Sequence, residues 1–250
     1  IPVQMQKNMR NWRKNAHPMD VLQAFVAALA GYYDEKGTEK EISHQRAINL
    51  IAKVPTIIAS WERVRNDKEP IEPDSNLSHA ANFLYMLTGE SPDKEMERVF
   101  DVCLILHADH TFNASTFAAR EVASTRAHMY SAVSAAVGAL SGELHGGANF
   151  EVMKMLLNIK EESNVESWVK EKIENGDRIM GMGHAVYKTV DPRSMVLKEL
   201  SKKLSEKTGL PWFSITRKIE ETTSELMKNR KERDIFPNVD LYSASVYYML

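Results

Sequence analysis

The chain has 250 residues, and its 32 Lys and Arg against 34 Asp and Glu give a formal net charge of −2, which provides no net positive field for nucleic acid. No apolar run is long enough to span a bilayer, and residues 1–4 show no basic segment followed by an apolar one, so we expect neither a membrane span nor a signal peptide. The single cysteine, Cys103, excludes an intrachain disulfide and favours a cytoplasmic protein.

Helical periodicity dominates the chain. Apolar side chains recur at three- and four-residue spacing, which predicts helices over residues 19–33, 40–65, 77–87, 95–106, 129–140, 152–159, 161–176, 195–207 and 211–228. Alternating β-branched runs closed by hairpin turns are nearly absent. The sequence therefore predicts an all-α protein.

The segment 129–140 consists largely of Ala, Ser, Gly and Val, whose side chains are too small to fill a core by themselves. One interpretation is a buried helix that pairs with a partner helix and delivers His145 at its end, where Gly146 and Gly147 stop the helix. The other is a small-residue core helix with a glycine C-cap and an incidental histidine. The spacing alone leaves both open.

Two later segments also place chemical groups beside turn-forming residues. His184 follows the glycine-containing segment 181–183, and Arg193 lies nearby on a turn stiffened by proline. Asp240 follows a Pro-Asn turn at the start of an apolar segment. Taken separately, these features also fit a C-cap, a turn and an N-cap, and Asn149 fits a cap of the next helix.

In combination, these motifs identify a family. The chain contains, in order, His-Gly-Gly-Ala-Asn at 145–149, Gly-His-Ala-Val-Tyr-Lys at 183–188, Asp-Pro-Arg at 191–193 and Pro-Asn-Val-Asp at 237–240. This combination resembles the citrate synthase family. The segments 107–110 and 113–116 and residues 17–20 extend the resemblance over essentially the whole chain.

The resemblance implies a fold and an activity. Residues 1–146 and 246–250 would belong to a large helical domain and 147–245 to a small one, with the active site in the cleft between them. The protein would be an acyltransferase of the tricarboxylic acid cycle that condenses acetyl-CoA with oxaloacetate and hydrolyses citryl-CoA to citrate and CoA. It would be a homodimer through the 129–142 region and would need neither metal nor organic cofactor.

The resemblance also implies roles for individual residues. Asp240 would be the base that takes a proton from the methyl group of acetyl-CoA, and His145 would donate a hydrogen bond to the thioester oxygen. His184 would polarise the ketone of oxaloacetate. His110 matches a further substrate-binding histidine, and Arg193 matches an arginine that pairs with an oxaloacetate carboxylate.

Four further residues would contact CoA: Gly181 and Gly183 through close backbone approach, and Lys231 and Arg233 through the CoA phosphates. Members of the family carry additional N- and C-terminal portions, the latter with two more substrate-binding arginines. Because Arg193 alone would leave much of the charge of oxaloacetate unpaired, we expect these 250 residues taken alone to be weakly active or inactive.

Three alternatives remain open at this point. A 2-methylcitrate synthase would use propionyl-CoA with the same catalytic residues. A non-enzymatic helical scaffold would use the 129–142 face for dimerisation and would need neither Asp240 nor His184. A metal-dependent hydrolase would use as ligands a cluster with no downstream pair at a familiar spacing, together with residues scattered singly along the chain: His107, Asp109 and His110, then His145, His184 and Asp240.

Overall fold

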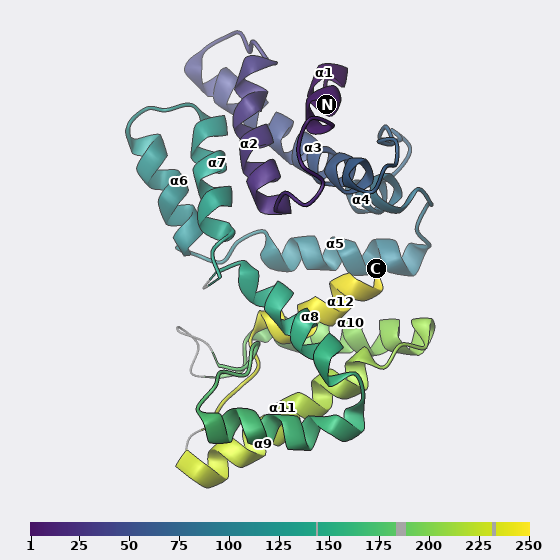
Figure 1. The fold of residues 1–250 in the computed structure, drawn as a ribbon. Helices are drawn as coiled ribbons and strands as arrows, with labels where there is room; N and C mark the ends of the chain where they lie inside the picture. Colours follow the sequence, from purple (N-terminus) through teal and green to yellow (C-terminus); the bar gives the residue numbers. More distant parts are fainter. Residues whose placement is uncertain (144, 184–188, 232–233) are drawn as a thin grey trace. The chain divides into compact units, whose positions relative to one another are not determined.

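The computed structural model describes residues 1–143, 145–183, 189–231 and 234–250, and the side chains of all of these except 230 and 231. Regular structure in these ranges is helical, apart from an isolated bridge between Met182 and Pro237 (Figure 1). The predicted all-α fold is therefore confirmed. None of the described helices combines the length and the apolar character that crossing a membrane requires.

The chain divides into two compact units, Ile1–His145 and Gly146–Leu250. The first unit holds α1 (Val3–Met9), α2 (Pro18–Ala28), η1 (Leu29–Gly31), α3 (Glu39–Arg65), α4 (His79–Thr88), α5 (Lys94–His107), α6 (Ala114–Ser124) and α7 (Met129–Leu140). Side-chain caps begin most of these helices, including a capping box between Thr38 and Glu41 at the start of α3. Buried apolar side chains from α1, α2, α3 and α7 form its core.

Helix α7 occupies the predicted residues and lies against α2 and α6 (Figure 1). The Ser134 hydroxyl donates to the Gln23 carbonyl oxygen at 3.0 Å. A Cβ at Gly138 would come within 2.5 Å of the Gln23 Nε2. The small side chains of α7 therefore permit close packing against α2 within the same chain.

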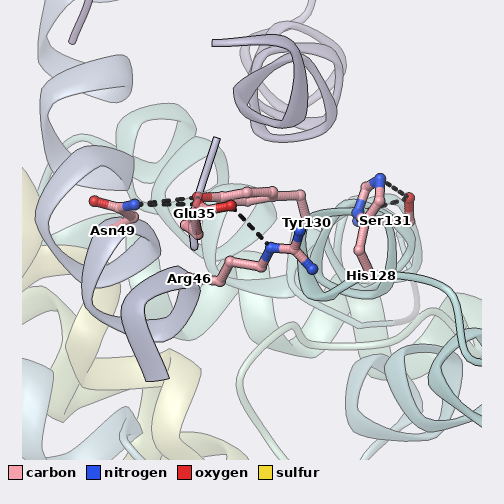
Figure 2. A network of polar contacts seen from close by, with 6 residues as sticks. All are labelled: Glu35, Arg46, Asn49, His128, Tyr130 and Ser131. Atoms are coloured by element: carbon pink, nitrogen blue, oxygen red, sulfur yellow. Dashed lines mark hydrogen bonds and ion pairs between the residues drawn. The ribbon is translucent and has the colours of Figure 1, made fainter. Parts of the chain in front are cut away.

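A buried polar network fixes the N-terminal end of α7 to α3 and to the loop before it (Figure 2). The Glu35 side chain, 4% exposed, accepts hydrogen bonds from the Tyr130 hydroxyl at 2.5 Å and from Arg46 Nε at 3.1 Å. The Asn49 amide contacts both Glu35 and Tyr130. Burial alone would raise the pKa of Glu35, but the hydrogen bonds from Tyr130 and Arg46 outweigh it and lower this pKa.

The second unit holds α8 (Gly147–Ile159), η2 (Glu162–Asn164), α9 (Val165–Asn175), α10 (Pro192–Thr208), α11 (Trp212–Lys231) and α12 (Val239–Met249). Helix α12 is its centre, because eight of its eleven residues are buried and it packs on α8, α10 and α11. The hydroxyls of Ser201 and Ser245 lie 2.8 Å apart between α10 and α12. Residues 246–250 lie in this unit, and their expected grouping with residues 1–146 stays a prediction.

Three local expectations were wrong. Gly146 and Gly147 do not stop α7, which ends at Leu140; they begin α8 instead. Asn149 is therefore inside α8, where its amide donates to the Ser243 hydroxyl at 2.5 Å rather than capping the helix. Arg193 lies in the first turn of α10 and not in a loop, because Pro192 is well suited to the first helical position.

Candidate active site

His145 lies at the end of the first unit beside the start of α6. The Ser115 backbone N–H donates to His145 Nε2 at 3.3 Å, and the Ser115 hydroxyl oxygen lies 3.0 Å from the same nitrogen. Asn113 orders this turn because its Oδ1 accepts from the Thr116 N–H and from the Ser115 hydroxyl. The histidine is thus held by the cap of a helix thirty residues earlier in the chain.

The contact with Ser115 assigns the tautomer of His145. A backbone N–H can only donate, so Nε2 must be unprotonated to accept it. A neutral imidazole then carries its proton on Nδ1. His145 is therefore prepared to donate one hydrogen bond from Nδ1.

His110 is half-buried in the short segment between α5 and α6. The next residue, Thr111, has φ 57°, an uncommon conformation for a β-branched residue, and its N–H donates to Asp109 Oδ1 at 3.0 Å. In the first unit the structure therefore places His110 and His145 on the two segments that flank α6 and α7.

In the second unit, the segment before His184 is tied to the segment before Asp240. The Gly183 N–H donates to the Phe236 carbonyl oxygen at 2.8 Å, and the Asn238 N–H donates to that of Gly181 at 2.9 Å. The Asn238 amide adds a bond to the Gly183 carbonyl oxygen at 2.8 Å. Three hydrogen bonds thus join residues 181–183 to residues 236–238, which lie more than fifty positions further along the chain.

Position 181 requires glycine because its backbone lies directly against α12. Its φ is 81°, and a Cβ there would lie 2.8 Å from the Leu241 Cα, a distance that real Cβ atoms do not show. Gly183 also has positive φ, 86°, but a Cβ there would meet only the end of Ile235 at 3.6 Å. The two glycines therefore differ: one allows close packing, and the other mainly supplies a backbone conformation.

Asp240 lies in the first turn of α12, and its N–H is held by Asn238 Oδ1 at 2.9 Å. Burial raises the pKa of Asp240 to about 6, although the positive charge of Arg193 opposes this and the negative charge of Asp191 supports it. A carboxylate whose pKa lies close to neutrality is suited to general-base catalysis, because it is mostly ionised at neutral pH yet basic enough to accept a proton.

Arg193 is held by a buried carboxylate. Its Nε and Nη2 donate to Asp191 Oδ1 at 3.1 Å and Oδ2 at 2.7 Å, and the Asp191 residue is 0% exposed. The structure therefore brings Gly181, Gly183, Arg193 and Asp240 together in the second unit. Asp191 and Ser115 were not predicted as site residues, although both lie within the motifs that carry the family resemblance.

Two predicted residues, His184 and Arg233, lie outside the described residues. Lys231 ends α11, and its side chain is likewise outside the description. Among the described residues, no three His, Cys, Asp or Glu side chains gather as a metal site, which leaves the metal-hydrolase alternative without support from this part of the chain. A largely apolar cavity of about 510 Å³ between α2, α3 and α4 contains none of the candidate residues.

Comparison with known proteins gives one consistent result. The family model described as "Citrate synthase, C-terminal domain" matches residues 1–250. The chain is 42% identical to a citrate synthase of Haloferax volcanii and 43% identical to one of Synechocystis sp., with 93% and 97% of the chain covered. It is also 42% identical to the "Citrate/2-methylcitrate synthase" of Bacillus subtilis over 95% of its length.

Solved structures agree with these relatives. The citrate synthase of Pyrobaculum aerophilum matches with a TM-score of 0.89 at 40% identity and covers the whole chain. The citrate synthase of Thermoplasma acidophilum, in a ternary complex with carboxymethyl coenzyme A and oxaloacetate, matches with a TM-score of 0.90 at 32% identity. The chain spans 62% and 61% of the first two relatives and 65% of each of these structures.

Proposed function

Because this chain belongs to the citrate synthase family, we propose that the protein condenses acetyl-CoA with oxaloacetate and hydrolyses the resulting citryl-CoA to citrate and CoA. The observation that carries this proposal is Asp240, a largely buried carboxylate at the start of α12 whose pKa is raised to about 6. Asp240 takes a proton from the methyl carbon of acetyl-CoA, and the electron pair moves toward the thioester oxygen.

The tautomer of His145 supports its role in the same step. Negative charge develops on the thioester oxygen as the methyl proton leaves, and a positioned N–H donor stabilises it. Ser115 occupies Nε2 of His145, so Nδ1–H is the donor available for this oxygen. This role requires a neutral imidazole that keeps its proton on Nδ1. The hydrogen bond from the Ser115 N–H to Nε2 favours that form.

The remaining steps assign the other residues. The nucleophilic methylene carbon attacks the ketone carbon of oxaloacetate, and the ketone oxygen gains a proton from His184. Arg193 and His110 bind oxaloacetate, with Arg193 paired to a carboxylate. Water then cleaves the thioester, which releases CoA and leaves citrate.

The test is a thiol-release assay on the full-length protein with acetyl-CoA and oxaloacetate. Asp240→Asn should lower kcat by about 10²- to 10⁴-fold, because the base is lost while the size of the side chain is kept. The matched control is Asp234→Asn, an exposed aspartate in the same segment, which should leave kcat unchanged. Absence of citrate formation by the wild type, or full activity of Asp240→Asn, would contradict the proposal.

A stability measurement separates loss of chemistry from loss of fold. Burial disfavours the ionised form of Asp240, so the native state carries an energetic penalty above pH about 6 that disappears as the carboxyl is protonated at lower pH. Asp240→Asn removes that penalty. The inactive variant should therefore be more stable than the wild type at neutral pH, by on the order of 1–3 kcal/mol in urea unfolding, with the gain vanishing near pH 4.

The alternative substrate is propionyl-CoA, favoured by the resemblance to the Bacillus subtilis relative named for both activities. The same residues would act in that reaction. Rates of the full-length protein with acetyl-CoA and propionyl-CoA distinguish the two. We further propose a cytoplasmic homodimer in which Gly181, Gly183, Lys231 and Arg233 contact CoA.

A further inference from the structure

Asp191 is the only acidic or basic residue among the described positions that is buried throughout, with 0% exposure. Burying a carboxylate is costly unless it is paired and hydrogen-bonded. Asp191 meets this requirement within its own turn: Oδ1 accepts from the Arg193 N–H at 3.0 Å and from Nε at 3.1 Å, and Oδ2 accepts from Nη2 at 2.7 Å.

Helix capping requires only one of the two carboxylate oxygens of Asp191. An N-cap needs a single acceptor, and the neutral side chains of Ser78, Asn113 and Asn238 cap α4, α6 and α12 in this protein. Oδ1 of Asp191 performs the same task for α10. The second oxygen accepts from Nη2 of the Arg193 guanidinium, a contact that capping does not require.

This arrangement fixes which edge of Arg193 remains available. A guanidinium has five N–H donors. Asp191 takes two of them on the Nε–Nη2 edge, which leaves three, including both on Nη1. The two contacts hold the plane of the guanidinium, and the Arg193 side chain is only 13% exposed.

We propose that Asp191 is a positioning residue, which holds Arg193 by its Nε–Nη2 edge so that the Nη1–Nη2 edge receives a carboxylate of oxaloacetate. This inference rests on the proposed function. Oxaloacetate then binds at the Nη1–Nη2 edge of the guanidinium, because Asp191 already occupies the Nε–Nη2 edge. A guanidinium fixed beforehand loses less conformational freedom on binding than a free arginine side chain does.

The pKa of Asp240 provides a second measurement, because it would not depend on the charge of Asp191 if Asp191 only capped the helix. Helix α10 contributes Asp191 and Arg193, whose charges act on Asp240, and Lys198, which pairs with Glu220 of α11. From α8, Lys154 pairs with Glu151. Since the charge of Asp191 supports the raised pKa of Asp240, neutralising it should lower that pKa.

The decisive variant is Asp191→Asn in the full-length protein. The amide oxygen keeps the cap, whereas the amide nitrogen faces Nη2 as a second donor, so the two-point hold on Arg193 is lost. We expect the KM for oxaloacetate to rise by about 10- to 100-fold and the acid limb of kcat/KM to move to lower pH. Asp93→Asn, at the N-cap of α5, is the matched control and should change neither.

Arg193→Lys tests the same contact from its other end. It keeps the charge but not the two-point geometry, so the KM for oxaloacetate should rise without a shift of the acid limb. Adding Asp191→Asn to Arg193→Lys should raise KM no further, because Asp191 acts through Arg193. The single variant Arg193→Lys also keeps the proposal testable if Asp191→Asn does not fold.

The outcomes are distinguishable. A wild type that forms no citrate overturns the proposed function itself. An active wild type with a KM for oxaloacetate within about twofold in Asp191→Asn, or with fully additive effects in the double variant, overturns the positioning role alone.

Discussion

At the scale of single residues, protonation of Asp240 sets the expected pH dependence. Its pKa is raised to about 6, chiefly by burial, so the base is ionised above that pH and neutral below it. We predict that kcat/KM for citrate formation falls about tenfold per pH unit below pH 6 and is level above it, until another group titrates. An acid limb near pH 4, the ordinary range of an exposed aspartate, would contradict the burial of this carboxyl.

A second prediction at this scale concerns Gly181. Gly181→Ala combines a strained positive φ with a Cβ 2.8 Å from the backbone of Leu241, so the start of α12 must shift. We expect a loss of about 2 kcal/mol or more in the free energy of unfolding, and lower activity because Asp240 immediately precedes Leu241 in the same turn.

Gly209→Ala is the control for Gly181→Ala. Gly209 also has positive φ, 71°, but nothing lies within 4 Å of its added Cβ. It should cost only about 1 kcal/mol, in urea unfolding, and leave activity intact. Equal losses for the two variants would mean that the contact with Leu241 is unimportant.

At the scale of elements, the Glu35 network attaches α7 to α3 (Figure 2). Tyr130→Phe removes the hydroxyl that donates to Glu35 and leaves a nearly buried carboxylate with one fewer hydrogen bond. The expected cost near neutral pH is about 1–3 kcal/mol in the free energy of unfolding. Tyr85→Phe removes a hydroxyl that makes no hydrogen bond within the described part of the chain, and it should cost less.

The pH dependence of this variant has a definite sign. The folded-state pKa of Glu35 is lowered, so its ionised form stabilises the native state above the unfolded pKa, and this contribution disappears as pH falls through the folded value. The difference between wild type and Tyr130→Phe should therefore shrink in acid. A constant difference at all pH values would show that packing, and not the hydrogen bond, accounts for the effect.

The elements also show what periodicity could not predict. The pattern that predicted the helix at 40–65 includes Ile48 and Ile51, which are 54% and 65% exposed on α3. Helix α6 was not predicted, since most of its apolar residues are alanines, and none of its side chains is buried in the structure. Periodicity reports which faces are apolar, whereas burial depends on what packs against them.

At the scale of the whole molecule, the proposed homodimer through the 129–142 region is open to a direct test. Leu140 ends α7 and is 37% exposed. Leu140→Asp places a charge in the proposed interface, which should shift the full-length protein from dimer to monomer in sedimentation velocity. Leu210→Asp, at 38% exposure in the other unit, should remain dimeric. If Leu140→Asp also remains dimeric, this helix is not the interface.

The sequence by itself determined the helical class, the position of α7 and the family, because periodicity and short motifs are local properties of the chain. Only the tertiary structure decided how those motifs are prepared for chemistry. The Nδ1 proton of His145 depends on Ser115, and the raised pKa of Asp240 depends on burial and on charges of α10. Both are set by groups that folding brings close, and desolvation and hydrogen bonding act through space, whatever the separation along the chain.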